Sequence, residues 1–237
     1  MQLTTLAAFL FPIPLTILMI KDHSIFNQLY RMNLLFGSLL FLPIILGIIS
    51  SMLIYLERDN DTLKNLLTIP ISKNRLILAK LTVVLFLSEV YSFGSLVALF
   101  IANILMKTTV NMGFFLAINL IVGLAVFIGI IPVIIIIILL NGSYVPAIII
   151  SIVYAIVSLV VTLMIGSVNE ASLQLLSSIL PIPIILRWCI GVLPLEINLP
   201  EALHSTQISS MNFAFIMIVY LIVLTYLAVY FYRKSKN

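Results

Sequence analysis

Charged side chains are scarce in this chain of 237 residues. Only 8% of the residues are Asp, Glu, Lys or Arg, whereas 63% are hydrophobic and the mean hydropathy is +1.29. Soluble domains carry about 25% charged residues, so this composition excludes an ordinary soluble domain and indicates an integral membrane protein. The formal net charge of +4 does not indicate nucleic-acid binding, because the basic residues lie beside apolar runs.

Residues that build catalytic and metal sites are also few. A single cysteine, Cys189, excludes a disulfide within the chain and a cysteine-based metal cluster, and we interpret it as a small buried apolar residue. His23 and His204 stand far apart without an H-E-x-x-H motif, which disfavours a metalloprotease. The absence of G-x-x-x-x-G-K-[ST] excludes ATP binding in the P-loop manner. We therefore predict no catalytic residue, metal or cofactor in this chain, and expect any energy to come from another subunit or a gradient.

Long uncharged runs predict an all-α membrane protein with six transmembrane helices. About 20 residues cross a hydrocarbon core, so the uncharged run from Thr108 to Asn169 must hold two spans, separated at the turn-like residues 141–144. A signal peptide is the alternative for the first run, but no basic segment precedes it. Within a single transmembrane domain, 1–237, we predict spans near residues 1–20, 34–56, 81–106, 114–140, 145–168 and 212–232.

One further apolar stretch, residues 171–195, is broken by prolines and by Arg187. With six spans and the N-terminus inside, eight of the twelve Lys and Arg residues lie in the cytoplasm, whereas a seventh span leaves five inside and six outside. Because cytoplasmic loops are enriched in Lys and Arg, six spans are favoured. We interpret 171–195 as an outer re-entrant helical element, and we expect both termini to be cytoplasmic.

The segment from residue 57 to residue 80 holds eight of the twenty charged residues. Asp61 is suited to N-cap a short helix at 62–68, in which three leucines follow at helical spacing. Pro70 ends this helix, which is too short to be stable alone in water and therefore needs a partner. Ser72 is predicted to cap a second helix, which begins with Lys73 and continues without interruption into the third span.

This segment resembles the cytoplasmic loop of type-2 ATP-binding-cassette exporter permeases, particularly small ones that serve antimicrobial-peptide export or immunity. After an acidic residue, the shared pattern is Asp61-Thr62-Leu63, Leu66-Leu67, Pro70-Ile71-Ser72, Arg75 and Ala79-Lys80-Leu81. In that family the loop contains a coupling helix, which sits in a groove of a separate ATPase subunit and transmits its opening and closing. The family usually opens with a basic amphipathic helix, whereas here Met1 leads almost directly into a span, so either that helix is absent or the sequence starts after it.

The resemblance implies an ABC-type ATPase partner that holds ATP and magnesium, and a second permease that is identical or related. It also implies an outer re-entrant element between the last two spans. We expect the three leucines to dock into the ATPase, with polar contacts around them. The residues expected in this contact are Asp61, Thr62, Leu63, Lys64, Leu66, Leu67, Pro70, Ser72 and Arg75. Antimicrobial-peptide export or self-immunity is the activity that the resemblance implies, and the near absence of charge in the spans favours an amphipathic or apolar substrate.

Glu89 is the main candidate for a functional residue within the spans. It follows Lys80 by nine residues, which places it roughly 13 Å into the membrane, where a charge is costly and usually faces a bundle interior or a wet cavity. The alternative is a neutral carboxyl bonded to a neighbouring span. Polar residues on two spans, which helix packing explains equally well, complete the candidate substrate path: Ser92, Ser151, Tyr154, Ser158 and Thr162. Two alternative functions are a gradient-driven carrier or channel that uses Glu89, and a non-transporting membrane scaffold or sensor.

Overall fold

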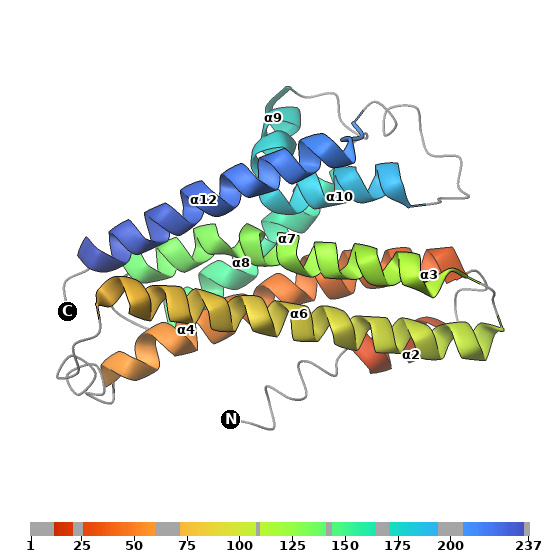
Figure 1. The fold of residues 1–237 in the computed structure, drawn as a ribbon, viewed down its shortest axis with the longest axis horizontal. Coiled ribbons are helices and arrows are strands. Elements are labelled where there is room, and N and C mark those ends of the chain that lie inside the picture. Colours follow the sequence, from red (N-terminus) through yellow and green to blue (C-terminus); the bar gives the residue numbers. More distant parts are fainter. Residues whose placement is uncertain are drawn as a thin grey trace.

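The computed structural model describes residues 12–20, 26–59, 72–107, 110–140, 144–164, 171–193 and 206–234. Every regular element in these ranges is a helix, as the sequence predicts (Figure 1). In chain order the helices are α2 (Pro12–Ile20), α3 (Phe26–Met32), the π-helix η1 (Asn33–Phe41), α4 (Leu42–Asp59), α6 (Lys73–Met106), α7 (Met112–Leu139), α8 (Tyr144–Met164), α9 (Ala171–Ile179), α10 (Pro181–Val192) and α12 (Ser210–Lys234).

Five helical units of the described chain are long and apolar enough to cross a membrane. They are the continuous run of α3, η1 and α4 over Phe26–Tyr55, and the single helices α6, α7, α8 and α12. These units overlap the second to the sixth predicted spans. The first predicted span, 1–20, is described only for the nine residues of α2, so the total of six spans stays a prediction.

The second span begins earlier than the sequence predicted. The predicted span began near residue 34, but Phe26, Leu29 and Tyr30 are buried and α3 continues directly into η1. The sequence prediction missed these buried residues because it placed spans only in uncharged runs. Arg31 interrupts the run, although the apolar residues around it recur at helical spacing. The segment just before Pro43 is π-helical, with the Leu42 N–H bonded to the Gly37 carbonyl five residues earlier.

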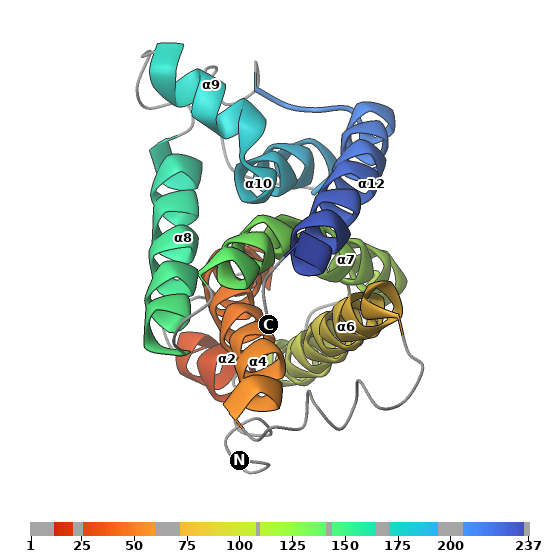
Figure 2. The same cartoon turned by 90° about the vertical axis from the view of Figure 1, so that its left-hand side faces the viewer.

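Helix α7 forms the centre of the bundle (Figure 2). It contacts α4, α6, α8, α10 and α12, and 78% of its most apolar window is buried inside the protein. A helix that is apolar on all sides suits this position, because it has neighbours in every direction. By contrast, only 17% of the corresponding window of α12 is buried, so most of this window is not covered by the described part of the chain.

Helices α9 and α10 form the pair of short helices expected within residues 171–195. The chain bends at Leu180, which is extended, and Pro181 follows at the start of α10. Proline is suited to this position because its missing N–H has no partner in the first turn of a helix. Helix α10 packs against α12, and α9 packs against α8 and α10, as Figure 2 shows. Whether the pair enters the outer leaflet stays a prediction.

Candidate coupling site and transport path

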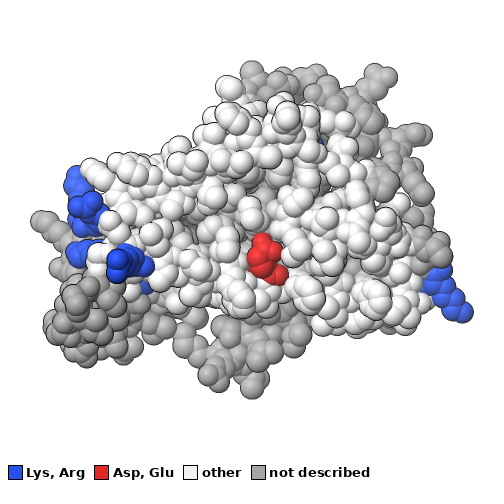
Figure 3. Space-filling view, in the orientation of Figure 1, with Lys and Arg blue, Asp and Glu red and all other residues white. Residues whose placement is uncertain are grey.

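Five of the eight basic side chains that the structure describes lie at the end of the bundle where α6 begins and α12 ends, and Figure 3 shows this group at one end of the molecule. Lys73, Arg75 and Lys80 lie in the first turns of α6, and Arg233 and Lys234 lie in the last turn of α12. A membrane protein concentrates such residues on its cytoplasmic side. That this end faces the cytoplasm stays a prediction.

The whole of the predicted coupling helix, 62–68, lies outside the described residues, which end at 59 and resume at 72. The residues concerned are Asp61, Thr62, Leu63, Lys64, Leu66, Leu67 and Pro70. Their contact with an ATPase stays a prediction.

Ser72 occupies the N-cap position of α6, as the sequence predicted. Its backbone is extended, and its carbonyl accepts the N–H groups of Arg75 and Leu76 at 3.0 and 3.2 Å. Its side chain makes no capping hydrogen bond, so the backbone alone defines the start of α6. Arg75 is exposed, so its guanidinium is accessible for contact with a partner.

Lys80 joins the beginning of α6 to the end of α12. Although it is a lysine, it is only 7% exposed. Its ammonium donates to the Tyr232 hydroxyl at 3.5 Å and lies 5.4 Å from the centre of the Tyr232 ring, within range of a cation–π interaction. A displacement of the start of α6 would therefore be passed to α12 as well.

Glu89 lies in the middle of α6, where this helix meets α7. It is the one acidic residue whose side chain the structure describes, and the acidic patch in Figure 3 lies midway along the bundle. Its Oε1 atom is buried and makes no hydrogen bond with the described residues. An added Cβ at Gly123 of α7 would lie 3.3 Å from this oxygen, so the carboxylate adjoins a glycine notch. The expected alternative, in which a neighbouring span bonds the carboxyl, finds no support at Oε1.

The other candidate path residues are divided between two helix contacts. Ser92 is buried in α6, directly opposite Gly123. On α8, Ser151 and Thr162 are buried and donate to carbonyls of their own helix, at 2.8 and 2.6 Å. The Tyr154 hydroxyl donates to the Gly129 carbonyl of α7 at 2.6 Å, and Ser158 is fully buried. Within one subunit these side chains serve helix packing, and the structure does not bring the α8 set together with Glu89 and Ser92 into one lined channel.

Buried amides form polar contacts that the sequence reasoning missed. The Asn33 side chain donates to the Ser95 hydroxyl at 2.7 Å, and the Tyr30 hydroxyl donates to Asn119 Oδ1 at 3.2 Å. Both asparagines are at least 97% buried, since they are 2% and 3% exposed. These bonds join the second span to α6 and to α7. The sequence did contain a signal for these contacts, namely an asparagine within an apolar run. Its side-chain amide favours a hydrogen bond to a neighbouring helix in the membrane.

Cys189 is fully buried in α10, in agreement with its interpretation as a small apolar residue. Burial raises the pKa of its thiol, because desolvation disfavours the thiolate. Among the described residues there is no group of three His, Cys, Asp or Glu side chains that could hold a metal ion.

The comparisons with known proteins bear on this arrangement. Residues 1–158 match the family model described as ABC-2 family transporter protein. The match includes the predicted coupling segment and all of α6 and α7. No match was found among curated proteins, and none was found among solved structures.

Proposed function

Because this chain belongs to the ABC-2 family of transporter proteins, we propose that it couples ATP hydrolysis in a partner ATPase to the export of an amphipathic or apolar peptide. The chain is a multi-pass membrane permease, and its family implies an ABC ATPase partner in general. An antimicrobial peptide is the proposed cargo, and a second permease, identical or related, is the proposed partner within the membrane.

The continuity of α6 carries this proposal. The helix runs for 34 residues, or about 51 Å at about 1.5 Å per residue, which exceeds a hydrocarbon core of about 30 Å. It begins directly after the predicted coupling helix and reaches the far side of the bundle without a break. A displacement of its first turn would therefore be transmitted to Glu89 and, through Lys80, to α12.

The proposed substrate class follows from the membrane-facing surface. The exposed side chains of α6 near Glu89 are large and apolar, with Phe86 at 64% and Phe93 at 59% exposure. A hydrophilic solute would find almost no charged group there, whereas an amphipathic peptide could place a polar group near Glu89 and its apolar side chains against the phenylalanines. The bacterial cytoplasmic membrane, with both chain termini inside, is the proposed location.

A charge inserted into the predicted coupling helix tests this function. In proteoliposomes that contain the permease and its ATPase, we expect Leu66→Glu to abolish ATP-dependent peptide export, because a buried unpaired carboxylate would weaken the docking. Asn65→Glu is the matched control, since it adds the same charge on the polar face of the same predicted helix. Normal export by Leu66→Glu would contradict the proposed coupling role.

The gradient-driven alternative is tested in the same vesicles. We expect no peptide flux when a proton gradient is imposed without ATP, and no loss of ATP-driven flux when an uncoupler removes the gradient. Proton-dependent flux in the absence of the ATPase would favour a carrier that uses Glu89. Failure of an ATPase to copurify with the full chain would favour the scaffold alternative.

A further inference from the structure

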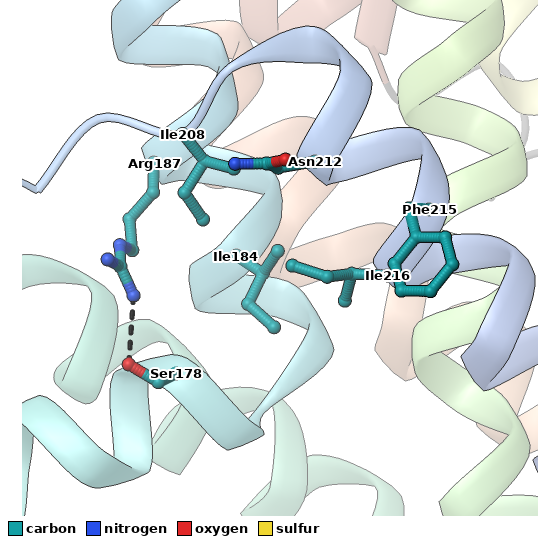
Figure 4. A pocket seen from close by; sticks show the side chains of 7 residues that line it. All are labelled: Ser178, Ile184, Arg187, Ile208, Asn212, Phe215 and Ile216. Carbon is teal, nitrogen blue, oxygen red and sulfur yellow. Dashed lines mark hydrogen bonds between the residues drawn. The ribbon is translucent and has the colours of Figure 1, made fainter.

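A cavity of about 330 Å³ lies between α9, α10 and the beginning of α12, away from the residues considered so far (Figure 4). One side is polar, with a guanidinium, a hydroxyl and a side-chain amide, and the other is apolar. The lining residues are Ser178, Ile184, Arg187, Ile208, Asn212, Phe215 and Ile216.

Arg187 is held in place by two hydrogen bonds. Its Nε donates to the Thr206 carbonyl at 2.8 Å, and its Nη1 donates to the Ser178 hydroxyl at 3.0 Å. A guanidinium has five N–H donors, so three remain without a partner among the described residues. Glu89 is the one acid whose side chain is described, and it belongs to α6, which does not line the cavity. The cavity therefore presents a fixed positive charge that no described acid neutralises.

Partial burial lowers the pKa of Arg187 from its usual value, because desolvation disfavours the cation. An anion beside the guanidinium would offset this cost. The two protein acceptors that Arg187 already has, a carbonyl and a hydroxyl, are both neutral.

The cavity lies at the level of a membrane surface. The Trp188 ring stacks on Phe213 at 4.5 Å between ring centres, and its Nε1 donates to the Ser210 hydroxyl at 3.2 Å. These contacts attach α10 to the first turn of α12. Since α12 runs for 25 residues, about 37 Å, to the basic end at Lys234, its first turn reaches the opposite surface of the bilayer. Tryptophan is enriched at this depth, where lipid head groups lie.

The apolar wall of the cavity continues into the lipid-facing side of α12. Phe215 lines the cavity and is 69% exposed. Met211, Ile218 and Ile222 are 84%, 56% and 65% exposed, and with Phe215 they form a stripe at helical spacing. A molecule with its anionic group at Arg187 could therefore lay an acyl chain along this stripe.

We propose that this cavity binds the phosphate group of an anionic phospholipid in the leaflet opposite the basic end. Arg187 pairs with the phosphate oxygens, which suit its planar donor geometry. Ser178 and Asn212 border the head group, and Phe215 and Ile216 contact the first part of an acyl chain. A peptide carboxylate has the same charge and also suits the guanidinium, but it carries no acyl chain to cover the apolar stripe.

Binding of a fluorescent phosphatidylglycerol to the full chain in detergent tests the site. We expect Arg187→Gln to weaken binding about tenfold or more, the usual effect of removing a charged hydrogen-bonding partner, and Arg187→Lys to weaken it less. Lys107→Asn is the matched control. It removes an exposed positive charge at the end of α6 on the same side of the bundle, and asparagine tolerates the left-handed backbone found there (φ 51°). Wild-type affinity in Arg187→Gln would overturn the proposal.

Unlabelled competitors show whether the anion bound at Arg187 belongs to a lipid, to a free phosphate compound or to a peptide. Unlabelled phosphatidylglycerol should displace the probe, whereas glycerol phosphate, which has no acyl chain, should displace it poorly. Equal displacement by glycerol phosphate, or stronger displacement by a short peptide with a free carboxylate, would overturn the assignment to a lipid. If Arg187→Gln does not fold, Phe215→Ala serves instead, because this side chain is mostly exposed, and it should weaken lipid binding without changing the thermal stability.

Discussion

Glu89 places a carboxyl group in the middle of α6. One of its two oxygens, Oε1, is buried and makes no hydrogen bond among the described residues. Since a bond at Oε1 does not explain its presence, we expect Glu89→Gln to assemble normally but to lower ATP-driven export about tenfold, the effect of about 1.4 kcal/mol. The measurement is initial export rate in proteoliposomes at matched protein content.

Thr82→Val is the control for this variant on the same helix. Its exposed hydroxyl donates to the Leu78 carbonyl of its own helix at 2.9 Å, so its removal should leave export unchanged. Unchanged export in Glu89→Gln would remove Glu89 from the substrate path.

Gly123 is the residue that lets α6 and α7 approach closely. The Ser88 hydroxyl donates to its carbonyl at 2.7 Å, and a Cβ added there would lie 3.0 Å from Ser92 Cβ and in direct conflict with the Ser92 hydroxyl. We expect Gly123→Ala to destabilise the protein by about 1–3 kcal/mol, the usual cost of overpacking. A thermal unfolding scan in detergent measures the change.

Two variants show whether the Gly123 effect comes from this contact. Gly113→Ala in the same helix should be nearly neutral, because its added Cβ would meet only Asn111 Oδ1, at 3.4 Å. Ser92→Gly combined with Gly123→Ala should recover most of the lost stability, since it removes the conflicting atoms. If the double variant is as unstable as the sum of the two single variants, the contact is not the cause.

At the scale of the element, η1 is stabilised from outside its own helix. The Tyr91 hydroxyl of α6 donates to the Gly37 carbonyl of η1 at 3.0 Å and is fully buried. We expect Tyr91→Phe to cost about 1 kcal/mol of stability, the usual value of a hydrogen bond, and to increase amide hydrogen exchange in η1. Tyr226→Phe on α12, where the side chain is 70% exposed, is the control. Equal protection of η1 in both variants would show that this bond does not stabilise the π-helix.

The elements also show what could be predicted from the sequence. Uncharged length alone placed the long helices, and Pro181 marked the break between α9 and α10. The π-helix could not be predicted in this way, because its Gly37 carbonyl accepts a hydrogen bond from the hydroxyl of Tyr91, which lies in a distant part of the chain. The sequence also could not show whether the polar face of α8 lines a path or packs against another helix. Ser151 on this face packs against Gly47 of α4, and only the fold brings these two residues together.

For the whole molecule, the distribution of charge predicts the orientation in the membrane. Ser72 precedes α6 at the basic end, and Gln207 precedes α12 at the opposite end. We expect a membrane-impermeant maleimide to label Gln207→Cys in intact cells, and to label Ser72→Cys only after the cells are permeabilised, because cytoplasmic ends retain Lys and Arg. Both positions are exposed, and the Ser72 side chain makes no capping bond that the cysteine would lose.

The chain itself supplies the control for this labelling. Cys189 is its single cysteine, and it is fully buried with a thiol whose pKa is raised by burial, so the unmodified protein should remain unlabelled. Labelling of Ser72→Cys before permeabilisation would place the basic end outside the cell. A cytoplasmic ATPase could not then reach the start of α6, and both the coupling role and the leaflet assigned to the Arg187 cavity would be contradicted. The coupling site and the Arg187 cavity therefore both depend on the orientation of the whole molecule in the membrane.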